Sequence, residues 1–248
     1  MNLERVIALR TNKTVYRDDD KAIKLFGSGY SKSDVMREAL CHAVIEETEL
    51  NVPKIIEVTG MDSKWAVITE YIPGKTLERL MQEHPEKSEE YMECLLDVQL
   101  KIHSQKADGL PNMRYCLINQ IKKSPLDAST RYALLEELDN IPEHDKLCHG
   151  HLDPSNIIIT PQGTPYILDW AYASTGNGAA DAARAYLLMS YDGKTELAEK
   201  YLRLYCRKSD TAIQYIRKWI PIVAASQLIK CKSAERDFLM KRINIVEY

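Results

Sequence analysis

Four polar side chains near the middle of the sequence have the types and spacing needed to hold a metal ion and accept a proton. His151 and Asp153 lie five and three residues before Asn156, and Asp169 lies thirteen residues after it. Amide and carboxylate oxygens suit Mg²⁺, so Asn156 and Asp169 can hold one ion that bridges the phosphates of ATP. The imidazole of His151 or the carboxylate of Asp153 can accept a hydroxyl proton. This set predicts the chemistry of phosphoryl transfer.

The residues between the two metal ligands predict how these ligands meet. Short strand-like runs at 156–160 and 166–169 flank a Pro- and Gly-containing segment, in which Gly163 suits a tight turn. A hairpin of this kind would bring Asn156 and Asp169 together. Either residue alone would be an ordinary loop or turn residue, but their joint spacing favours a metal site.

The rest of the chain predicts an α+β protein with two lobes. A helix is expected over 31–48, and four runs rich in β-branched and aromatic residues are expected to be strands: 15–17, 21–26, 52–58 and 64–71. From Thr76 onward apolar residues recur at helical spacing, apart from the hairpin above. We therefore expect a small antiparallel sheet with one helix in residues 1–72 and a larger, mostly helical lobe in residues 73–248.

Composition narrows the class of partner. The 248 residues carry a net charge of −3 at pH 7, which does not favour binding to nucleic acid or to an anionic membrane. The N-terminus lacks the apolar core of a signal peptide, and no uncharged apolar run reaches about 18 residues. The six cysteines form no C-x-x-C pair, so neither a disulfide framework nor a zinc ribbon is indicated. We expect a cytoplasmic protein.

The segment from Cys148 to Asn156, together with Ile167-Leu168-Asp169-Trp170, resembles the catalytic centre of the aminoglycoside phosphotransferase and choline kinase-like family. That family has a protein-kinase-like fold, and the resemblance covers nearly the whole chain. It implies an ATP- and Mg²⁺-dependent phosphotransferase that acts on a hydroxyl group of a small molecule. It also implies that the nucleotide binds in the N-terminal lobe and that the acceptor binds in the helical lobe.

Matching positions assign further roles by resemblance. Lys24, which ends an Ala-Ile-Lys triplet, matches the strand lysine that contacts phosphates, and Glu38 matches its helix partner. The segment from Glu70 through Ile72 resembles the connection between the lobes, where backbone groups pair with adenine. Asp181 matches an aspartate that braces the catalytic loop.

Two departures from the family pattern matter for function. His151 stands where the pattern has its catalytic aspartate, and Asp153 lies two residues further on. The loop at 10–14 contains no glycine, which makes close backbone approach to phosphates harder. Two interpretations remain: a kinase in which His151 or Asp153 positions the acceptor, or a nucleotide-binding pseudokinase or regulatory module.

A third interpretation comes from another class of enzyme. His149, His151 and Asp153 have the H-x-H-x-D spacing of metallo-β-lactamase-like zinc hydrolases. Such sites need further histidines from distant loops, but none of the six histidines follows residue 151, and the chain is helical after Asp169.

Charge in the C-terminal part bears on the acceptor. From Lys194 to the C-terminus there are twelve Lys and Arg against six Asp and Glu. This balance favours a small hydroxylated metabolite over a polycationic aminoglycoside.

Overall fold

The computed structural model describes residues 3, 5–10, 12–61, 63–191 and 193–243, which fall into two compact units. Unit 1 contains Met1–Ser88, Ala107–Gly109 and Pro154–Ala173, and unit 2 contains Glu89–Lys106, Leu110–Asp153 and Ser174–Tyr248. Both units are discontinuous in sequence. The expected lobes, 1–72 and 73–248, stay a prediction.

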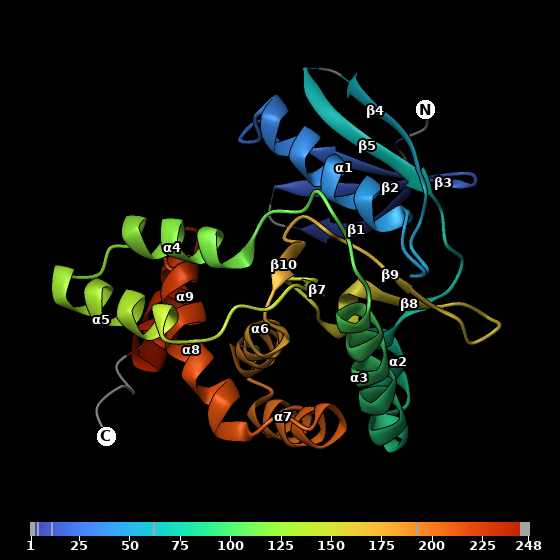
Figure 1. Cartoon of the computed structure of the whole chain (residues 1–248). Coiled ribbons are helices and arrows are strands. Elements are labelled where there is room, and N and C mark those ends of the chain that lie inside the picture. Colours follow the sequence, from blue (N-terminus) through green and yellow to red (C-terminus); the bar gives the residue numbers. More distant parts are fainter. Residues whose placement is uncertain (1–2, 4, 11, 62, 192, 244–248) are drawn as a thin grey trace. The chain divides into compact units, whose positions relative to one another are not determined.

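A five-stranded antiparallel sheet and one helix form the N-terminal part of unit 1 (Figure 1). The strand order is β1-β2-β3-β5-β4. The strands are β1 (Arg5–Arg10), β2 (Lys13–Asp18), β3 (Lys21–Phe26), β4 (Ile55–Met61) and β5 (Lys64–Glu70). Helix α1 (Lys32–Glu46) packs against β4 and β5. The expected sheet and helix are confirmed.

Helix α1 begins at a capping box and buries one apolar face. Ser31 accepts a hydrogen bond from the Asp34 backbone N–H, and the Asp34 carboxylate accepts one from the Ser31 backbone N–H. Val35 and Ala39 of the helix pack with Phe26 and Val67 of the sheet. This packing fixes the rotation of the helix about its axis, and with it the direction in which its polar residues point.

A second, three-stranded sheet in unit 1 contains the expected hairpin. Its strand order is β6-β8-β9, with β6 (Lys75–Thr76), β8 (Ile157–Ile159) and β9 (Pro165–Ile167). Gly163, at φ +81°, makes the turn between β8 and β9, and its N–H donates to the Thr160 carbonyl at 2.9 Å. Helix α2 (Leu77–Glu83) and the 3₁₀ turns η1 (Pro85–Lys87) and η2 (Pro154–Asn156) complete this part.

Helices make up most of unit 2. They are α3 (Ser88–Ser104), α4 (Met113–Lys123), α5 (Ala128–Asp139), α6 (Gly178–Tyr191), α7 (Thr195–Ser209), α8 (Ile213–Gln227) and α9 (Ser233–Ile243). Helix α6 is buried along most of its length. It packs against α7 and α8 (Figure 1). Strands β7 (Lys146–Cys148) and β10 (Ser174–Gly176) form a two-stranded sheet.

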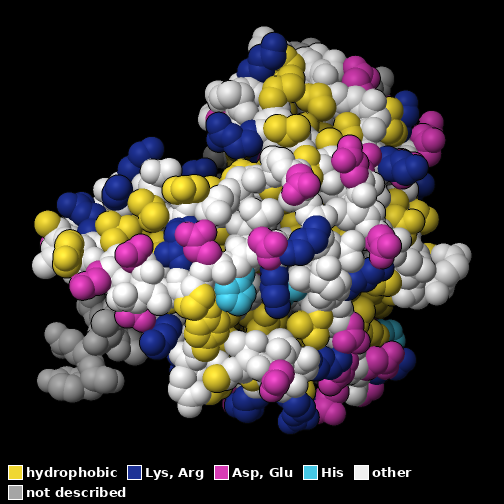
Figure 2. Space-filling model, in the orientation of Figure 1, with side chains coloured by type: hydrophobic (Ala, Val, Ile, Leu, Met, Phe, Trp, Pro, Cys, Tyr) yellow, Lys and Arg dark blue, Asp and Glu magenta, His cyan; other side chains and the backbone are white. Residues whose placement is uncertain are grey.

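Charges of both signs are mixed on the face of the molecule drawn in Figure 2. Figure 2 shows Lys and Arg side chains interspersed with Asp and Glu on the face in view. Within unit 2, Lys200 of α7 pairs with Glu89 of α3 at 2.7 Å, and Lys208 pairs with Asp97 at 2.6 Å.

Among the described residues, no helix combines the length and the apolar composition needed to cross a membrane.

Candidate functional site

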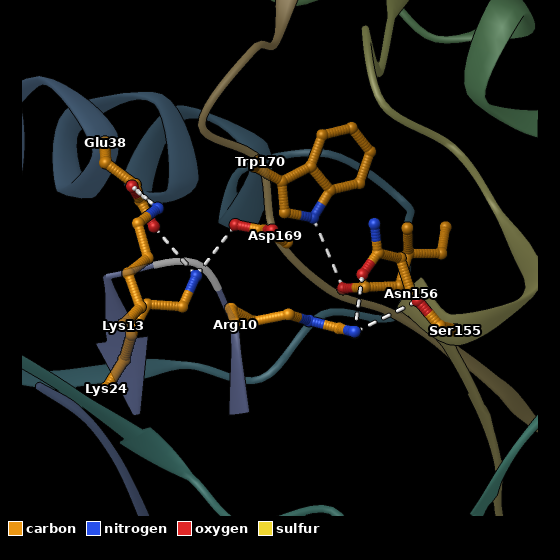
Figure 3. Close-up of polar contacts among 9 residues, drawn as sticks. Arg10, Lys13, Lys24, Glu38, Ser155, Asn156, Asp169 and Trp170 are labelled. Atoms are coloured by element: carbon orange, nitrogen blue, oxygen red, sulfur yellow. Dashed lines mark hydrogen bonds and ion pairs between the residues drawn. The ribbon is translucent and has the colours of Figure 1, made fainter. Parts of the chain in front are cut away.

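Lys24 of β3 lies between two carboxylates in unit 1 (Figure 3). Its Nζ is 2.7 Å from Glu38 Oε1 and 2.8 Å from Asp169 Oδ1. The other Glu38 oxygen, Oε2, lies 2.7 Å from Lys13 Nζ. The Glu38 side chain is 10% exposed and that of Lys24 23%. The structure thus brings together Lys24, Glu38 and Asp169, and adds Lys13, which sequence reasoning missed.

Strand alternation explains why Lys24 meets the helix. Lys24 and Phe26 share one face of β3, and Phe26 packs against Val35 of α1. Ile23 belongs to a separate apolar cluster on the opposite face. Lys24 therefore projects toward α1, where Glu38 lies on the same buried side as Val35.

The two carboxylates keep Lys24 charged. Burial acts to lower the pKa of Lys24, but the charges and hydrogen bonds of Asp169 and Glu38 outweigh it and hold that pKa above its ordinary value. The Lys13 ammonium also lies 5.0 Å from the centre of the Phe26 ring. Both lysines are fixed cations that share Glu38.

The expected hairpin between residues 156 and 169 is confirmed as β8–β9, and it joins the segments that carry Asn156 and Asp169. Ile157 pairs with Ile167, and the Leu168 N–H donates to the Asn156 carbonyl at 2.8 Å. The Asn156 carbonyl thus contacts the residue just before Asp169. Asp169 has φ +64°, a region that non-glycine residues rarely enter and that recurs at functional sites.

Trp170 anchors the turn that carries Asp169. Its side chain is buried, and its Nε1–H donates to the Ile167 carbonyl at 3.3 Å. The amide oxygen of Asn156 and the carboxylate of Asp169 are hard donors, so the pair fits Mg²⁺ chemically. Its role as the metal site stays a prediction.

Arg10 also reaches this place and was missed by sequence reasoning. Its Nη2 donates to Ser155 Oγ at 3.0 Å and lies 3.5 Å from Asn156 Oδ1 (Figure 3). In the sequence, the loop after β1 stands out only for its lack of glycine. Asn12 adopts φ +60° there, a conformation that asparagine tolerates better than most residues. The available signal was the pair of cations, Arg10 and Lys13, on either side of a two-residue connection.

The segment expected to contact adenine also belongs to unit 1. Glu70 ends β5, opposite Lys21, and its N–H donates to the Lys54 carbonyl at 2.9 Å. Ile72 follows and is buried. A Cβ on Gly74 would lie 2.3 Å from the Ile159 carbonyl oxygen, so close backbone packing holds the chain after Ile72.

The loop before Asn156 belongs to unit 2 and is held by Asp181. The Gly150 N–H donates to Asp181 Oδ1 at 2.7 Å, and the His149 N–H donates to Oδ2 at 3.3 Å. His103 Nε2 lies 3.0 Å from the same Oδ2. Burial acts to raise the pKa of Asp181, but His103 and the backbone donors outweigh it, so the pKa lies below its ordinary value. This is the bracing geometry that the resemblance implied.

His151 and Asp153 lie at the end of this loop, also in unit 2. Arg184 donates from Nε to the Gly150 carbonyl at 3.1 Å, and its Nη2 lies 3.4 Å from His151 Nδ1. A guanidinium can only donate, so we assign His151 Nδ1 as the acceptor and place the ring proton on Nε2. Nε2 lies 3.8 Å from Asp153 Oδ2. Sequence reasoning did not find Arg184.

The H-x-H-x-D residues do not gather as a zinc site would require. Among the described residues, one group of three possible ligands has its atoms within 4.8 Å of one another, namely His103, Cys148 and Asp181. It contains none of the three residues of that motif. The Asp181 carboxylate already accepts the Gly150 N–H.

Comparison with known proteins identifies the family. The sequence profile of the Phosphotransferase enzyme family matches residues 3–218, and no curated protein sequence matches the chain. A thermostable mutant of aminoglycoside phosphotransferase APH(4)-Ia, in ternary complex with ADP and hygromycin B, has a TM-score of 0.68 at 13% identity, covering 96% of this chain and 91% of that one.

Choline kinase LicA from Streptococcus pneumoniae has a TM-score of 0.65 at 16% identity, covering 98% of this chain and 94% of that one, and LicA has also been solved with AMP. Identities this low support a common fold and nothing finer. The family match spans most of the chain, and the arrangement of sheet, helix and helical part agrees with it. The chain therefore belongs to the Phosphotransferase enzyme family and has the α+β, protein-kinase-like fold of the aminoglycoside phosphotransferases and choline kinases.

Proposed function

We propose that this protein transfers the γ-phosphate of ATP to a hydroxyl group of a small molecule, with the help of Mg²⁺. The observation that carries the proposal is the contact of Lys24 with both Glu38 and Asp169, at the end of the hairpin that begins beside Asn156. Two oxygen ligands and a fixed cation are what binding of a metal-bound triphosphate requires. The structures similar in fold include complexes with ADP and AMP.

Unit 1 supplies the nucleotide side of the proposed reaction. Lys24 would contact the phosphates, with Glu38 fixing its position, and backbone groups at Glu70 and Ile72 would pair with adenine. Asn156 and Asp169 would hold Mg²⁺, which neutralises phosphate charge when bound. Phosphoryl transfer depends mainly on such positioning and charge neutralisation.

The loop in unit 2 supplies the acceptor side, and we assign the proton-accepting role to Asp153. Arg184 faces His151 Nδ1, which leaves the protonated Nε2 directed toward the Asp153 carboxylate. In this tautomer Nε2 already carries the ring proton and is a poor base, and a hydrogen bond to Asp153 would need the two groups to approach from 3.8 Å. His151 would then orient Asp153, and the two residues together would replace the usual catalytic aspartate.

The acceptor proposed here is a small hydroxylated metabolite. Two of the acidic residues that could attract a polycation already have lysine partners within unit 2. Glu89 pairs with Lys200 at 2.7 Å, and Glu137 lies 3.6 Å from Lys218. Hygromycin B and choline are named for the similar structures, and both belong in the panel of acceptors to be tested.

The test is transfer of labelled phosphate from ATP to a panel of sugars, amino alcohols and aminoglycosides, with and without Mg²⁺. Asp169→Asn is the control that removes the proposed metal ligand. Transfer that requires Mg²⁺ and is lost in Asp169→Asn supports the proposal, and equal transfer by both proteins refutes the site. If Mg²⁺-dependent ATP binding occurs without transfer to any acceptor, the chain is a pseudokinase or regulatory module.

A further inference from the structure

Two cations face each other at the tip of the first hairpin. Arg10 ends β1, Lys13 begins β2, and they are direct cross-strand partners. Like charges opposite each other in a sheet destabilise it unless each finds an anion or another acceptor. Lys13 is paired with the negatively charged Glu38, whose Oε2 lies 2.7 Å from Lys13 Nζ. Among the described residues, the hydrogen-bond partners of Arg10 are the neutral oxygens of Ser155 and Asn156, at 3.0 and 3.5 Å.

The hairpin tip is also poorly suited to bind phosphates through its backbone. A Gly-rich loop does so with several N–H groups turned toward the ligand, and glycine lets the backbone approach closely. Here two residues connect Arg10 to Lys13, and one of them is Asn12. The Asn12 carbonyl accepts the Gly27 N–H at 2.8 Å, which ties the tip to the end of β3. Among the described residues of the tip, the side-chain cations Arg10 and Lys13 are therefore the candidate phosphate-binding groups.

The contact between Arg10 and Asn156 competes with metal binding. Asn156 Oδ1 is the oxygen assigned to Mg²⁺ above, and the Arg10 guanidinium lies 3.5 Å from it (Figure 3). A divalent cation on the same oxygen would repel the guanidinium. The planar guanidinium fork fits phosphate oxygens well and forms charge-assisted bonds with them.

From this geometry we propose that Arg10 is a phosphate-binding residue of the site, replacing the backbone cradle that the glycine-free loop lacks. When Mg²⁺ and nucleotide bind, Arg10 leaves Asn156 and pairs with the outer phosphates. This inference rests on the proposed function, because it needs a nucleotide bound in unit 1. It states that Arg10 contacts the phosphates of the nucleotide and not its adenine or ribose.

The experiment compares the full-length wild type with Arg10→Gln and the matched control Arg5→Gln. Arg5 is exposed at the other end of β1, about 17 Å along the strand, and its loss changes net charge equally. Calorimetric titration with adenosine, AMP, ADP and AMP-PNP in the presence of Mg²⁺ gives four dissociation constants per protein. We expect Arg10→Gln to raise the dissociation constant of AMP-PNP by about 10- to 100-fold. The dissociation constant of adenosine should stay within about 2-fold of wild type.

The outcomes separate this inference from the proposed function. Wild type that binds none of the four ligands overturns both. Wild type that binds AMP-PNP while Arg10→Gln binds it equally well overturns the role of Arg10 alone. If Arg10→Gln weakens the binding of adenosine and of AMP-PNP equally, the role of Arg10 is also overturned, because the loss would then be structural. Tighter AMP-PNP binding by Arg10→Gln would mean that Arg10 hinders the metal at Asn156 and contributes no phosphate contact, which overturns the proposal.

Discussion

Lys24 Nζ lies 2.8 Å from Asp169 Oδ1, a contact that joins strand β3 to a turn 145 residues further along the chain. In this arrangement the lysine neutralises Asp169, which together with Asp153 is proposed to act in catalysis. The pair fixes where a metal-bound phosphate group would meet the sheet. The proposed metal ligand is therefore held by the cation that we propose to bind the phosphates.

Replacing Asp169 by asparagine is expected to remove the effect of Mg²⁺ on nucleotide binding. The amide keeps the size of the side chain but not its charge. Loss of groups that merely orient metal ligands already costs about 10- to 100-fold in metal affinity, so loss of a ligand should cost at least about 100-fold. Titration of AMP-PNP with increasing Mg²⁺ measures this. Asp108→Asn, an exposed carboxylate of the same unit, should behave as wild type. An unchanged Mg²⁺ response in Asp169→Asn would contradict the assignment.

Replacing Glu38 by glutamine tests whether one carboxylate holds both lysines. Lys24 keeps Asp169 as a partner, whereas the 2.7 Å ion pair of Lys13 is lost. Because Glu38 is largely buried, we expect the free energy of unfolding in urea to fall by about 1–3 kcal/mol. Glu47→Gln, exposed just after α1, should change it by less than about 0.5 kcal/mol. A Glu38→Gln protein as stable as Glu47→Gln would show that the shared contact contributes nothing.

The parts of the site that could be predicted from sequence depend on local pattern and on chain spacing. The β8–β9 hairpin follows from two short apolar runs and one glycine, so Asn156 and Asp169 could be paired without a structure. The match of Glu38 to Lys24 comes from the family resemblance, and the two meet in the structure because β3 and α1 pack through one apolar cluster.

Residues that reach the site from a distance could not be predicted in this way. Arg10 contacts residues 145 and 146 positions away, and Arg184 contacts the His151 ring 33 positions away. In a single sequence each appears only as a polar residue on an element whose partners are unknown. The tautomer of His151 depends on Arg184, so the choice between His151 and Asp153 as proton acceptor could not be made from the motif.

Substitutions of Asp153 and His151 are expected to lower kcat by different amounts. Asp153→Asn removes the proposed proton acceptor and should lower kcat by about 10²- to 10⁴-fold. His151→Asn removes the residue proposed to orient Asp153, and it should lower kcat less than Asp153→Asn does. Both should leave the dissociation constant of AMP-PNP within about 3-fold of wild type, since the proposed phosphate ligands are unchanged. Asp139→Asn, exposed at the end of α5, is the matched control. A larger loss in His151→Asn than in Asp153→Asn would make His151 the base.

Asp181 gives a prediction for the dependence of stability on pH. Its buried carboxylate accepts the N–H groups of His149 and Gly150 and pairs with His103, and Asp181→Asn would turn an amide N–H₂ group toward one of these donors. We expect a loss of about 2–4 kcal/mol in the free energy of unfolding at pH 7, measured in urea.

The sign of the pH effect follows from the lowered pKa of Asp181. A carboxylate whose pKa falls on folding contributes its full stabilisation above its unfolded pKa, about 3.9, and loses it as pH falls through the folded value. The stability difference between wild type and Asp181→Asn should therefore be constant from about pH 7 to pH 5 and shrink below about pH 4. Asp139→Asn should show no such trend. A difference that stays constant down to about pH 3 would mean that protonation of Asp181 is not linked to unfolding, and that the brace depends on the shape of the side chain and not on its charge.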